Sequence, residues 1–267
     1  MILTSFTHAG GAGKTTLVRD LGYELASRGY KVLVIDLDPQ ANLSTWLGVS
    51  VEREEGTVLE VIRKGNLPSP IRLHENYHLI PANILLAVGE IELAQKPLGE
   101  TLLRGALREW RGEYDFILVD SSPSLGKLAL LGALAGDGLI VPVEMTPKGL
   151  QAAATVLDIS HTYMQALRHM GQDIPGKHFI KLFVPTKYDP RTSVGKTALE
   201  TLLTSGLDIP IAPPISLRPG AYGWAAEHQV PMGMTPYAEA KEEVRKLAGF
   251  FLSLVGVSPK EKEVVHE

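Results

Sequence analysis

The chain has 267 residues and a formal net charge of −4 at pH 7; 45% of its residues are hydrophobic and 21% are charged. These values are typical of a soluble globular protein, and the length favours one domain with a large core. The chain contains no cysteine, which excludes disulfides, iron–sulfur clusters and thiolate metal sites within it and fits a cytoplasmic protein. Because the net charge is acidic, any affinity for DNA must come from a local basic patch.

Short apolar runs alternate with amphipathic stretches along the chain, a pattern typical of buried parallel strands separated by helices. We expect strands over residues 1–6, 31–36, 78–80, 116–120, 138–143, 179–184 and 209–215. We expect helices over residues 14–28, 56–64, 86–93, 99–111, 125–135, 149–170, 192–205 and 236–255. The alternation predicts an α/β fold, a single doubly wound domain whose mainly parallel central sheet is flanked by helices.

We place the domain over residues 1–257 and expect residues 258–267, where charges alternate, to form a disordered tail. No apolar run approaches the ~20 residues of a membrane span. The first apolar run begins at Ile2, so we also expect no signal peptide.

The first predicted strand leads through a glycine-rich loop into a helix, and the loop reads Thr7-His8-Ala9-Gly10-Gly11-Ala12-Gly13-Lys14-Thr15-Thr16. Glycines allow consecutive backbone N–H groups to point at phosphate oxygens, and the helix adds the positive end of its dipole. Lys14 is expected to reach the terminal phosphates, and the Thr15 hydroxyl to ligate Mg²⁺. The alternative is a glycine-rich turn without a ligand, and His8 stands where the general pattern has glycine. We predict nucleotide binding by residues Gly10, Gly11, Ala12, Gly13, Lys14, Thr15 and Thr16.

Acidic residues follow two of the other predicted strands: Asp36 and Asp38 end one, and Asp120 ends another. Ligands of open parallel sheets sit at the carboxyl ends of strands. An apolar strand that ends in aspartate after a P-loop is the Walker B arrangement, so Asp120 is expected to hold Mg²⁺ with Thr15. Asp38 lies further into its loop and is expected to face the γ-phosphate, near Mg²⁺, where it positions the attacking water. For Asp36 we favour a capping role or a supporting role behind the residues that contact the ligand.

These segments resemble the ParA/MinD family of deviant-Walker ATPases, and in particular its ParA (Soj-like) DNA-partition branch. The resemblance covers nearly the whole chain and rests on blocks in the family's order: 10–16, 34–42, 79–83 with 90–93, 114–126, 140–143, 188–192 and 218–231. It implies an ATP- and Mg²⁺-dependent switch that forms a homodimer when ATP is bound and binds DNA non-specifically. A ParB-like partner would then stimulate hydrolysis and release the DNA. The implied location is the cytoplasm, on nucleoid DNA, with no membrane attachment.

By position, the resemblance assigns phosphate and Mg²⁺ contacts to Lys14 and Thr15. Asp38, with Lys14, would be catalytic, and Asp120 would be the Walker B acid. Family members contact DNA through basic residues in the second half of the chain, where the candidates here are Arg218, Arg191 and Lys196. Each of these could equally be an ordinary solvated charge. ATP hydrolysis is expected to be weak without DNA and the partner.

The chain departs from the family at Ala9, where the deviant P-loop has a signature lysine that reaches the partner's nucleotide. Alanine supplies no charge to the phosphates, so we expect slow hydrolysis or recruitment of another cation, for which Lys148 is a candidate. An alternative is therefore a nucleotide-gated DNA-binding or scaffold protein with little hydrolysis.

Two further alternatives stay open. Residues Thr186-Lys187-Tyr188-Asp189 match a pattern with which GTPases read guanine, although we favour ATP. A MinD-like protein would bind a membrane through a basic amphipathic helix at the C-terminal end. Residues 241–255 are amphipathic, but their polar side mixes both charges, which favours a helix packed on the sheet.

Overall fold

The computed structural model describes residues 1–172, 174 and 176–257, so the tail predicted over 258–267 lies outside the described residues. Its centre is a seven-stranded sheet with the order β3-β4-β2-β5-β1-β6-β7, parallel except for the antiparallel pair of β3 and β4. The strands are β1 (Ile2–Ser5), β2 (Val32–Leu37), β3 (Ile71–His74), β4 (Tyr77–Ile80), β5 (Phe116–Ser121), β6 (Gly138–Glu144) and β7 (Ile180–Thr186). The single α/β domain with a mainly parallel sheet is therefore confirmed.

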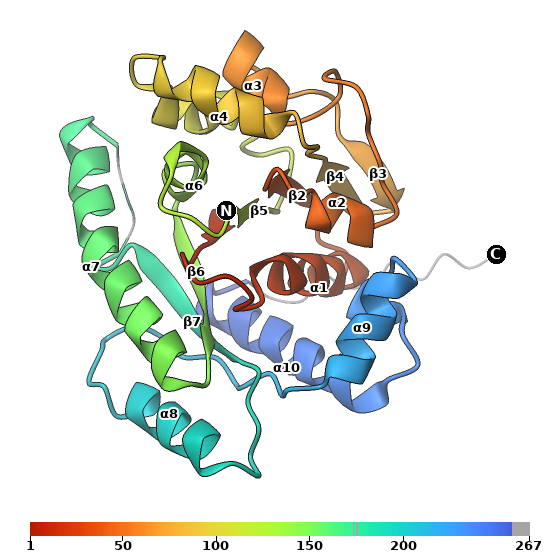
Figure 1. Cartoon of the computed structure of the whole chain (residues 1–267), viewed down its shortest axis with the longest axis vertical. Coiled ribbons are helices and arrows are strands. Elements are labelled where there is room, and N and C mark those ends of the chain that lie inside the picture. The colour runs from red at the N-terminus through yellow and green to blue at the C-terminus, as the bar shows by residue number, and fades with distance from the viewer. Residues whose placement is uncertain (173, 175, 258–267) are drawn as a thin grey trace.

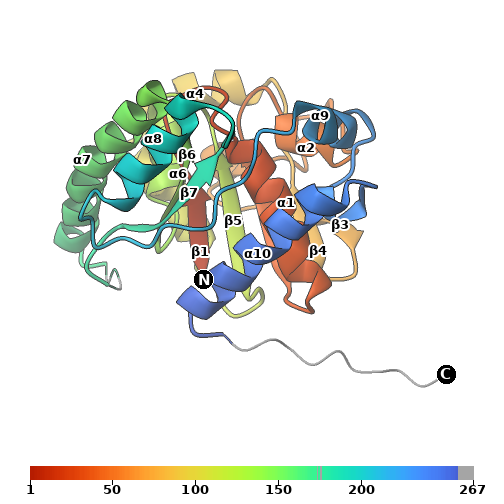
Figure 2. The ribbon, with the colours of Figure 1, turned by 90° about the horizontal axis from the view of Figure 1, so that it is seen from below.

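Helices cover both faces of the sheet. Figures 1 and 2 show α1 and α10 on one face and α6 and α7 on the other. The α-helices are α1 (Lys14–Ser27), α2 (Asn42–Trp46), α3 (Leu59–Lys64), α4 (Leu86–Ala94), α5 (Leu102–Ala106), α6 (Lys127–Ala133), α7 (Pro147–His169), α8 (Ser193–Leu203), α9 (Pro219–Glu227) and α10 (Ala238–Leu254). Two short 3₁₀ turns, η1 (Gly99–Thr101) and η2 (Met232–Met234), complete the described elements.

The central strands are buried along their full length, which explains their continuous apolar sequences. Every residue of β2 and β5 is buried, including the two aspartates near their ends. In the parallel register Asp36 lies opposite Asp120, and Ser5 at the end of β1 is the other neighbour of Asp120. The sheet thus brings the two acidic strand ends and the start of the glycine-rich loop to one edge.

The prediction of a strand over residues 209–215 was wrong. The segment follows β7 through two isolated bridges, Phe183 to Ile211 and Tyr188 to Ser216, and through a hydrogen bond from the Ile215 backbone to Pro185, without forming a continuous ladder. Pro210, Pro213 and Pro214 have no N–H to donate to a ladder, so a continuous strand cannot form.

The other differences are short elements. The helix predicted over 99–111 is broken into η1 and the five-residue α5. Four elements were missed: α2, β3, α9 and the short turn η2. α2 is held by the hydrogen bond from the Ser44 backbone to Asp36 of β2, and β3 is an edge strand with an irregular register. Neither segment has a strong apolar periodicity that would predict it.

Gly22 shows how closely α1 lies on the sheet, because a Cβ there would lie 2.9 Å from Val34 Cγ1 and 3.0 Å from Tyr77 Cε2. We expect Gly22→Val to lower the free energy of unfolding by about 2 kcal/mol, since buried side chains must move. Gly249→Ala on α10 is the control, with no atom nearer than 3.7 Å to the new Cβ, and should raise it by about 1 kcal/mol. Urea unfolding measures both; equal effects would contradict the close packing.

Candidate nucleotide-binding site

A cavity of about 450 Å³ opens at the edge of the sheet where the glycine-rich loop meets α1. One end is polar and is lined by Gly11, Gly13, Lys14, Thr15, Thr16 and Asp38. The other end is apolar and lies between α1, the segment 215–219 and α10, with Leu21, Tyr222 and Leu247 on its walls. A cavity that joins polar and apolar walls suits a ligand that carries phosphates on one side and a flat ring on the other.

The loop has the backbone that only glycines adopt easily. Gly11 and Gly13 have φ values of 76° and 95°, and Gly13 caps the start of α1. Ala12 is buried, and its carbonyl accepts a hydrogen bond from Thr186 Oγ1 at 2.9 Å. Gly10 has open space around it. The loop is therefore shaped around the cavity and tied to β7 on its other side.

Lys14 supplies a positive charge at the polar end of the cavity. Its side chain is buried, and its Nζ donates one long hydrogen bond, 3.5 Å, to the carbonyl oxygen of Ala9. Burial lowers the pKa of Lys14, while the charges of Asp120 and Asp38 raise it. A buried ammonium with so few partners is ready to accept an anion.

Asp120 is the most isolated charge of the site. Its side chain is fully buried, and neither carboxylate oxygen has a hydrogen-bond partner among the described residues, although the Thr15 hydroxyl approaches it. Burial, and then repulsion by Asp36, raise the pKa of Asp120 well above its usual value. A bare carboxylate beside a hydroxyl is the donor set that Mg²⁺ prefers, so these residues fit the ion.

No cluster of three or more carboxylate or histidine side chains that could hold a metal occurs within residues 1–172, 174 and 176–257. Asp120 and Thr15 would hold Mg²⁺ together with nucleotide phosphates and water, which is the usual way this ion is bound in phosphate sites. Asp38 lines the same cavity, is buried, and accepts a hydrogen bond from the backbone of Gln40 at 2.9 Å.

Asp36 has a structural partner instead of an open face. Its carboxylate accepts hydrogen bonds from the Ser44 backbone (2.9 Å), the Ser44 hydroxyl (2.7 Å) and the Asp38 backbone (3.1 Å). Burial raises the pKa of Asp36 to about 6, against the effect of these donors. The capping role predicted for Asp36 is confirmed. Sequence reasoning missed Ser44, which also accepts from the Ala82 backbone and so joins the ends of β2 and β4 through α2.

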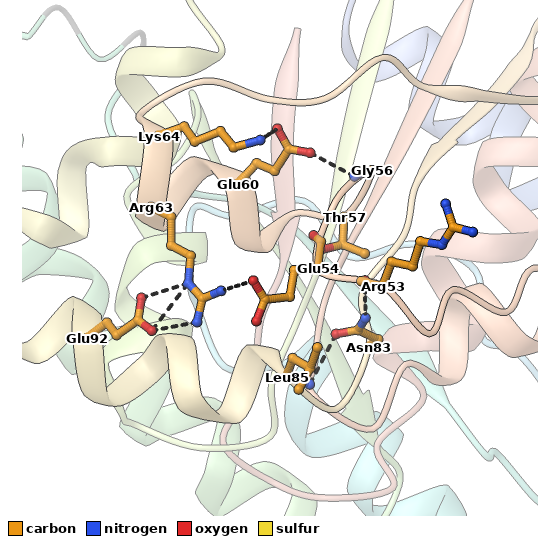
Figure 3. Close-up of polar contacts among 10 residues, drawn as sticks. All are labelled: Arg53, Glu54, Gly56, Thr57, Glu60, Arg63, Lys64, Asn83, Leu85 and Glu92. Atoms are coloured by element: carbon orange, nitrogen blue, oxygen red, sulfur yellow. Dashed lines mark hydrogen bonds and ion pairs between the residues drawn. The ribbon is translucent and has the colours of Figure 1, made fainter.

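The segment after α2 is clamped to α3 and α4, as Figure 3 shows. The Asn83 amide donates to the carbonyls of Val51 and Arg53, at 3.0 Å and 2.7 Å. Arg63 on α3 bridges Glu54 and Glu92 of α4. Residues 51–54 are thus held from two sides.

Asp189, which would read guanine in a GTPase, is occupied. Both of its oxygens accept from the Arg191 guanidinium, at 2.9 Å and 2.8 Å, and these contacts lower the pKa of Asp189 to about 2. Asp189 does not line the cavity. Neither observation favours guanine as the base.

The basic residues proposed for DNA differ in their surroundings. Arg218 lies on the cavity wall and pairs with Glu239 and Glu243, and Arg191 pairs with Asp189. Lys196 and Lys148, at the starts of α8 and α7, are exposed and form no ion pair with any residue that the structure describes.

The apolar side of α10 is used within the fold. Val244, Leu247, Phe251 and Leu252 are buried, three of them in the cluster that also contains Leu21 of α1. No helix of the described chain is both long enough and apolar enough to cross a bilayer. The packed helix predicted from the mixed charges is what the structure has.

In this parallel sheet a glycine-rich loop with its lysine follows β1, and an aspartate without a partner among the described residues lies near the end of the neighbouring strand β5. These features define a P-loop NTPase. A family model described as an AAA domain matches residues 2–170. The probable plasmid-partitioning protein ParA of Thermus thermophilus is 48% identical, covering all of this chain and 82% of that protein. The chain belongs to the ParA/MinD family of ATPases, with similarity to its ParA partition proteins.

Solved structures share the fold. A complex of a single-residue variant of Cyanothece McdA with ATP matches with a TM-score of 0.82 and 24% identity over 98% of both chains. Cobyrinic acid a,c-diamide synthase of Mycobacterium smegmatis, with ADP and magnesium, matches with a TM-score of 0.76 and 26% identity over 96% of this chain and 95% of that one.

The bare carboxylate predicts an unusual pH dependence. Since the folded-state pKa of Asp120 is raised, its contribution to nucleotide-free stability falls as pH rises above the unfolded value of about 4. Asp120→Asn should therefore raise the melting temperature without nucleotide, increasingly so from pH 5 to pH 8, and abolish the Mg²⁺-dependent part of stabilisation by ADP. Asp208→Asn, at an exposed residue whose pKa is lowered by Lys177, is the control. Thermal scans with Mg²⁺ or EDTA measure this, and a lower melting temperature for Asp120→Asn would contradict it.

Proposed function

We propose that this protein is a ParA-like switch for DNA partition, a homodimer when ATP is bound that holds DNA non-specifically and releases it on hydrolysis. The observation that carries the proposal is the unpartnered Asp120 carboxylate beside Thr15 and Lys14, in a chain 48% identical throughout to a probable plasmid-partitioning ParA. A ParB-like partner would stimulate hydrolysis, and the complex would lie on nucleoid DNA in the cytoplasm.

In this proposal each residue of the loop has a defined task. The amides of residues 10–16 and the Lys14 ammonium hold the phosphates, and Thr15 and Asp120 hold Mg²⁺. Mg²⁺, when bound, neutralises charge on the phosphate oxygens. Asp38 receives a hydrogen bond from water at the γ-phosphate and orients it for attack. The apolar walls at Leu21, Tyr222 and Leu247 suit the adenine ring.

DNA contact is proposed for Arg218, Arg191 and Lys196. Arg218 and Arg191 are each held by carboxylates, which reduces their attraction for phosphate unless those pairs open. Lys196 has no such competitor. Of the three, Lys196 should therefore contribute most in the conformation described.

The partition proposal predicts ATP-dependent DNA binding without sequence preference. We expect fluorescence anisotropy with two unrelated duplexes to show binding with ATP or a slowly hydrolysed analogue, little with ADP, and a steep loss with salt. Lys14→Ala should abolish it, and Lys196→Ala should weaken it more than Arg191→Ala. Binding that is equal with and without ATP, or specific for one duplex, would contradict the switch.

Ala9 marks the place where hydrolysis is expected to be slow. No lysine from this position can reach a partner's nucleotide, and a positioned cation or donor in such a site changes turnover by about 10²–10³-fold. Lys148 is exposed in the first turn of α7, directly after β6, on the same edge of the sheet as the loop. We propose it as the replacement; without one, the protein would act as a nucleotide-gated DNA-binding scaffold.

Turnover of four proteins separates these possibilities. With DNA present, Ala9→Lys should raise kcat at least about 10-fold over wild type if no other cation serves. If Lys148 serves, wild type should already be fast and Lys148→Met should be slow. Lys177→Met is the control for loss of a surface charge, because Lys177 is exposed and does not line the cavity. Phosphate release at saturating ATP gives kcat. Equal rates in all four proteins would make the missing lysine irrelevant to hydrolysis.

A further inference from the structure

We propose that Lys187 binds the polyphosphate chain of the nucleotide from the same subunit, as a second cation beside the glycine-rich loop. The proposal rests on the nucleotide binding proposed above and adds a contact that the loop does not contain. It is carried by three observations: the anchoring of the turn after β7, the backbone conformation of Lys187, and the place of its ammonium group.

The turn that carries Lys187 is fixed on both sides. Before it, Thr186 donates to the Ala12 carbonyl at 2.9 Å, and its own carbonyl accepts from the Met145 backbone at 3.0 Å. After it, the Tyr188 backbone exchanges hydrogen bonds with Ile215 (3.0 Å) and Leu217 (2.8 Å). The neighbours of Lys187 are thus tied to the loop, to β6 and to the segment that forms the far wall of the cavity.

Between these anchors Lys187 has φ of 52°, in the left-handed region that a residue with a Cβ rarely adopts. Glycine would take this conformation without strain. Side chains held in such conformations cluster at ligand-binding and catalytic sites, where the strain is offset by function. The presence of a long charged side chain here, in place of glycine, therefore calls for a role of that side chain.

The Lys187 side chain lies over the glycine-rich loop. Its Nζ is 3.6 Å from the point where a Cβ of Gly11 would be, and both residues line the cavity. The ammonium is therefore in contact with the glycine-rich loop. A bound polyphosphate would bring its negative charge to this end of the cavity, which both Lys187 and Lys14 line.

Lys187 is not committed to another strong partner. Its ion pair with Glu144 has an Nζ–Oε2 distance of 3.8 Å, and the two side chains are 41% and 31% exposed. Pairs of this length and exposure contribute little. A triphosphate with several negative charges outcompetes one distant carboxylate, so the pair with Glu144 does not prevent Lys187 from binding phosphate.

Strain and charge can be separated by two substitutions. Lys187→Gly removes the ammonium and relieves the backbone, and Lys187→Met removes the charge but keeps the length of the side chain. Leu98→Gly is the matched control, because Leu98 also has a positive φ, 54°, is exposed, and lies outside the cavity. Each variant is tested as the full chain for its melting temperature without ligand and for its affinity for a fluorescent ATP analogue.

We expect Lys187→Gly and Leu98→Gly both to melt at or above the wild-type temperature. Only the two Lys187 variants should bind the ATP analogue about 10-fold more weakly, with a shallower dependence of affinity on salt, in line with the loss of one charge contact of about 1.4 kcal/mol. In competition with the analogue, the inhibition constant of inorganic triphosphate should be lower for wild type than for Lys187→Met. The inhibition constant of adenosine should be the same for both proteins.

Unchanged triphosphate affinity in both Lys187 variants would overturn the proposal, and a weakened adenosine affinity alone would place Lys187 at the base instead. A Lys187→Gly protein with a lowered melting temperature would assign the residue to the fold and also overturn it. The proposed function fails separately: in that case wild type itself would not bind the analogue, or Lys14→Ala would bind it as well as wild type.

Discussion

The burial of Asp120 without a partner is the constraint on which the site depends. A carboxylate in the middle of a sheet, opposite Asp36 and with no hydrogen bond among the described residues, destabilises the nucleotide-free chain. The Lys14 ammonium lies near it and is also desolvated, so that burial lowers its pKa. A bound Mg²⁺ and phosphate would offset both charges, and Asp120 and Lys14 are the residues that would hold them.

Asp36, the neighbour of Asp120, is also a buried aspartate but has different surroundings. Asp36 and Asp120 lie opposite each other on paired strands, but α2 covers only Asp36, through Ser44. The Asp36 carboxylate therefore links β2, α2 and β4, whereas the Asp120 carboxylate has no such partner among the described residues and is the one we propose for Mg²⁺. Asp38, two residues beyond Asp36, is held at the cavity because the backbone before it is anchored.

The fold could be predicted from the sequence because its signals are local: buried strands read as apolar runs, and the glycine-rich loop has its lysine at a fixed spacing. The edge of the site could also be predicted, since parallel strands bring their ends together. Hydrogen bonds and ion pairs between residues far apart in the sequence could not be predicted. Nothing near Ser44 indicated its bond to Asp36, and nothing near Arg218 indicated that Glu239 and Glu243 neutralise it. The segment 209–215 has a strand-like apolar pattern, but its prolines prevent the ladder.

The contacts of residues 51–54 with Asn83 and Arg63 divide the chain after β2 into two parts that pack against different elements. From Asp38 to α2 the backbone belongs to the nucleotide cavity, whereas from Val51 onwards it belongs to the block formed by α3 and α4. Gly48, with φ of 74°, lies between the two anchored parts. Gly48 therefore marks the point at which the chain passes from the nucleotide cavity to the block of α3 and α4, so each of the two parts has its own set of contacts.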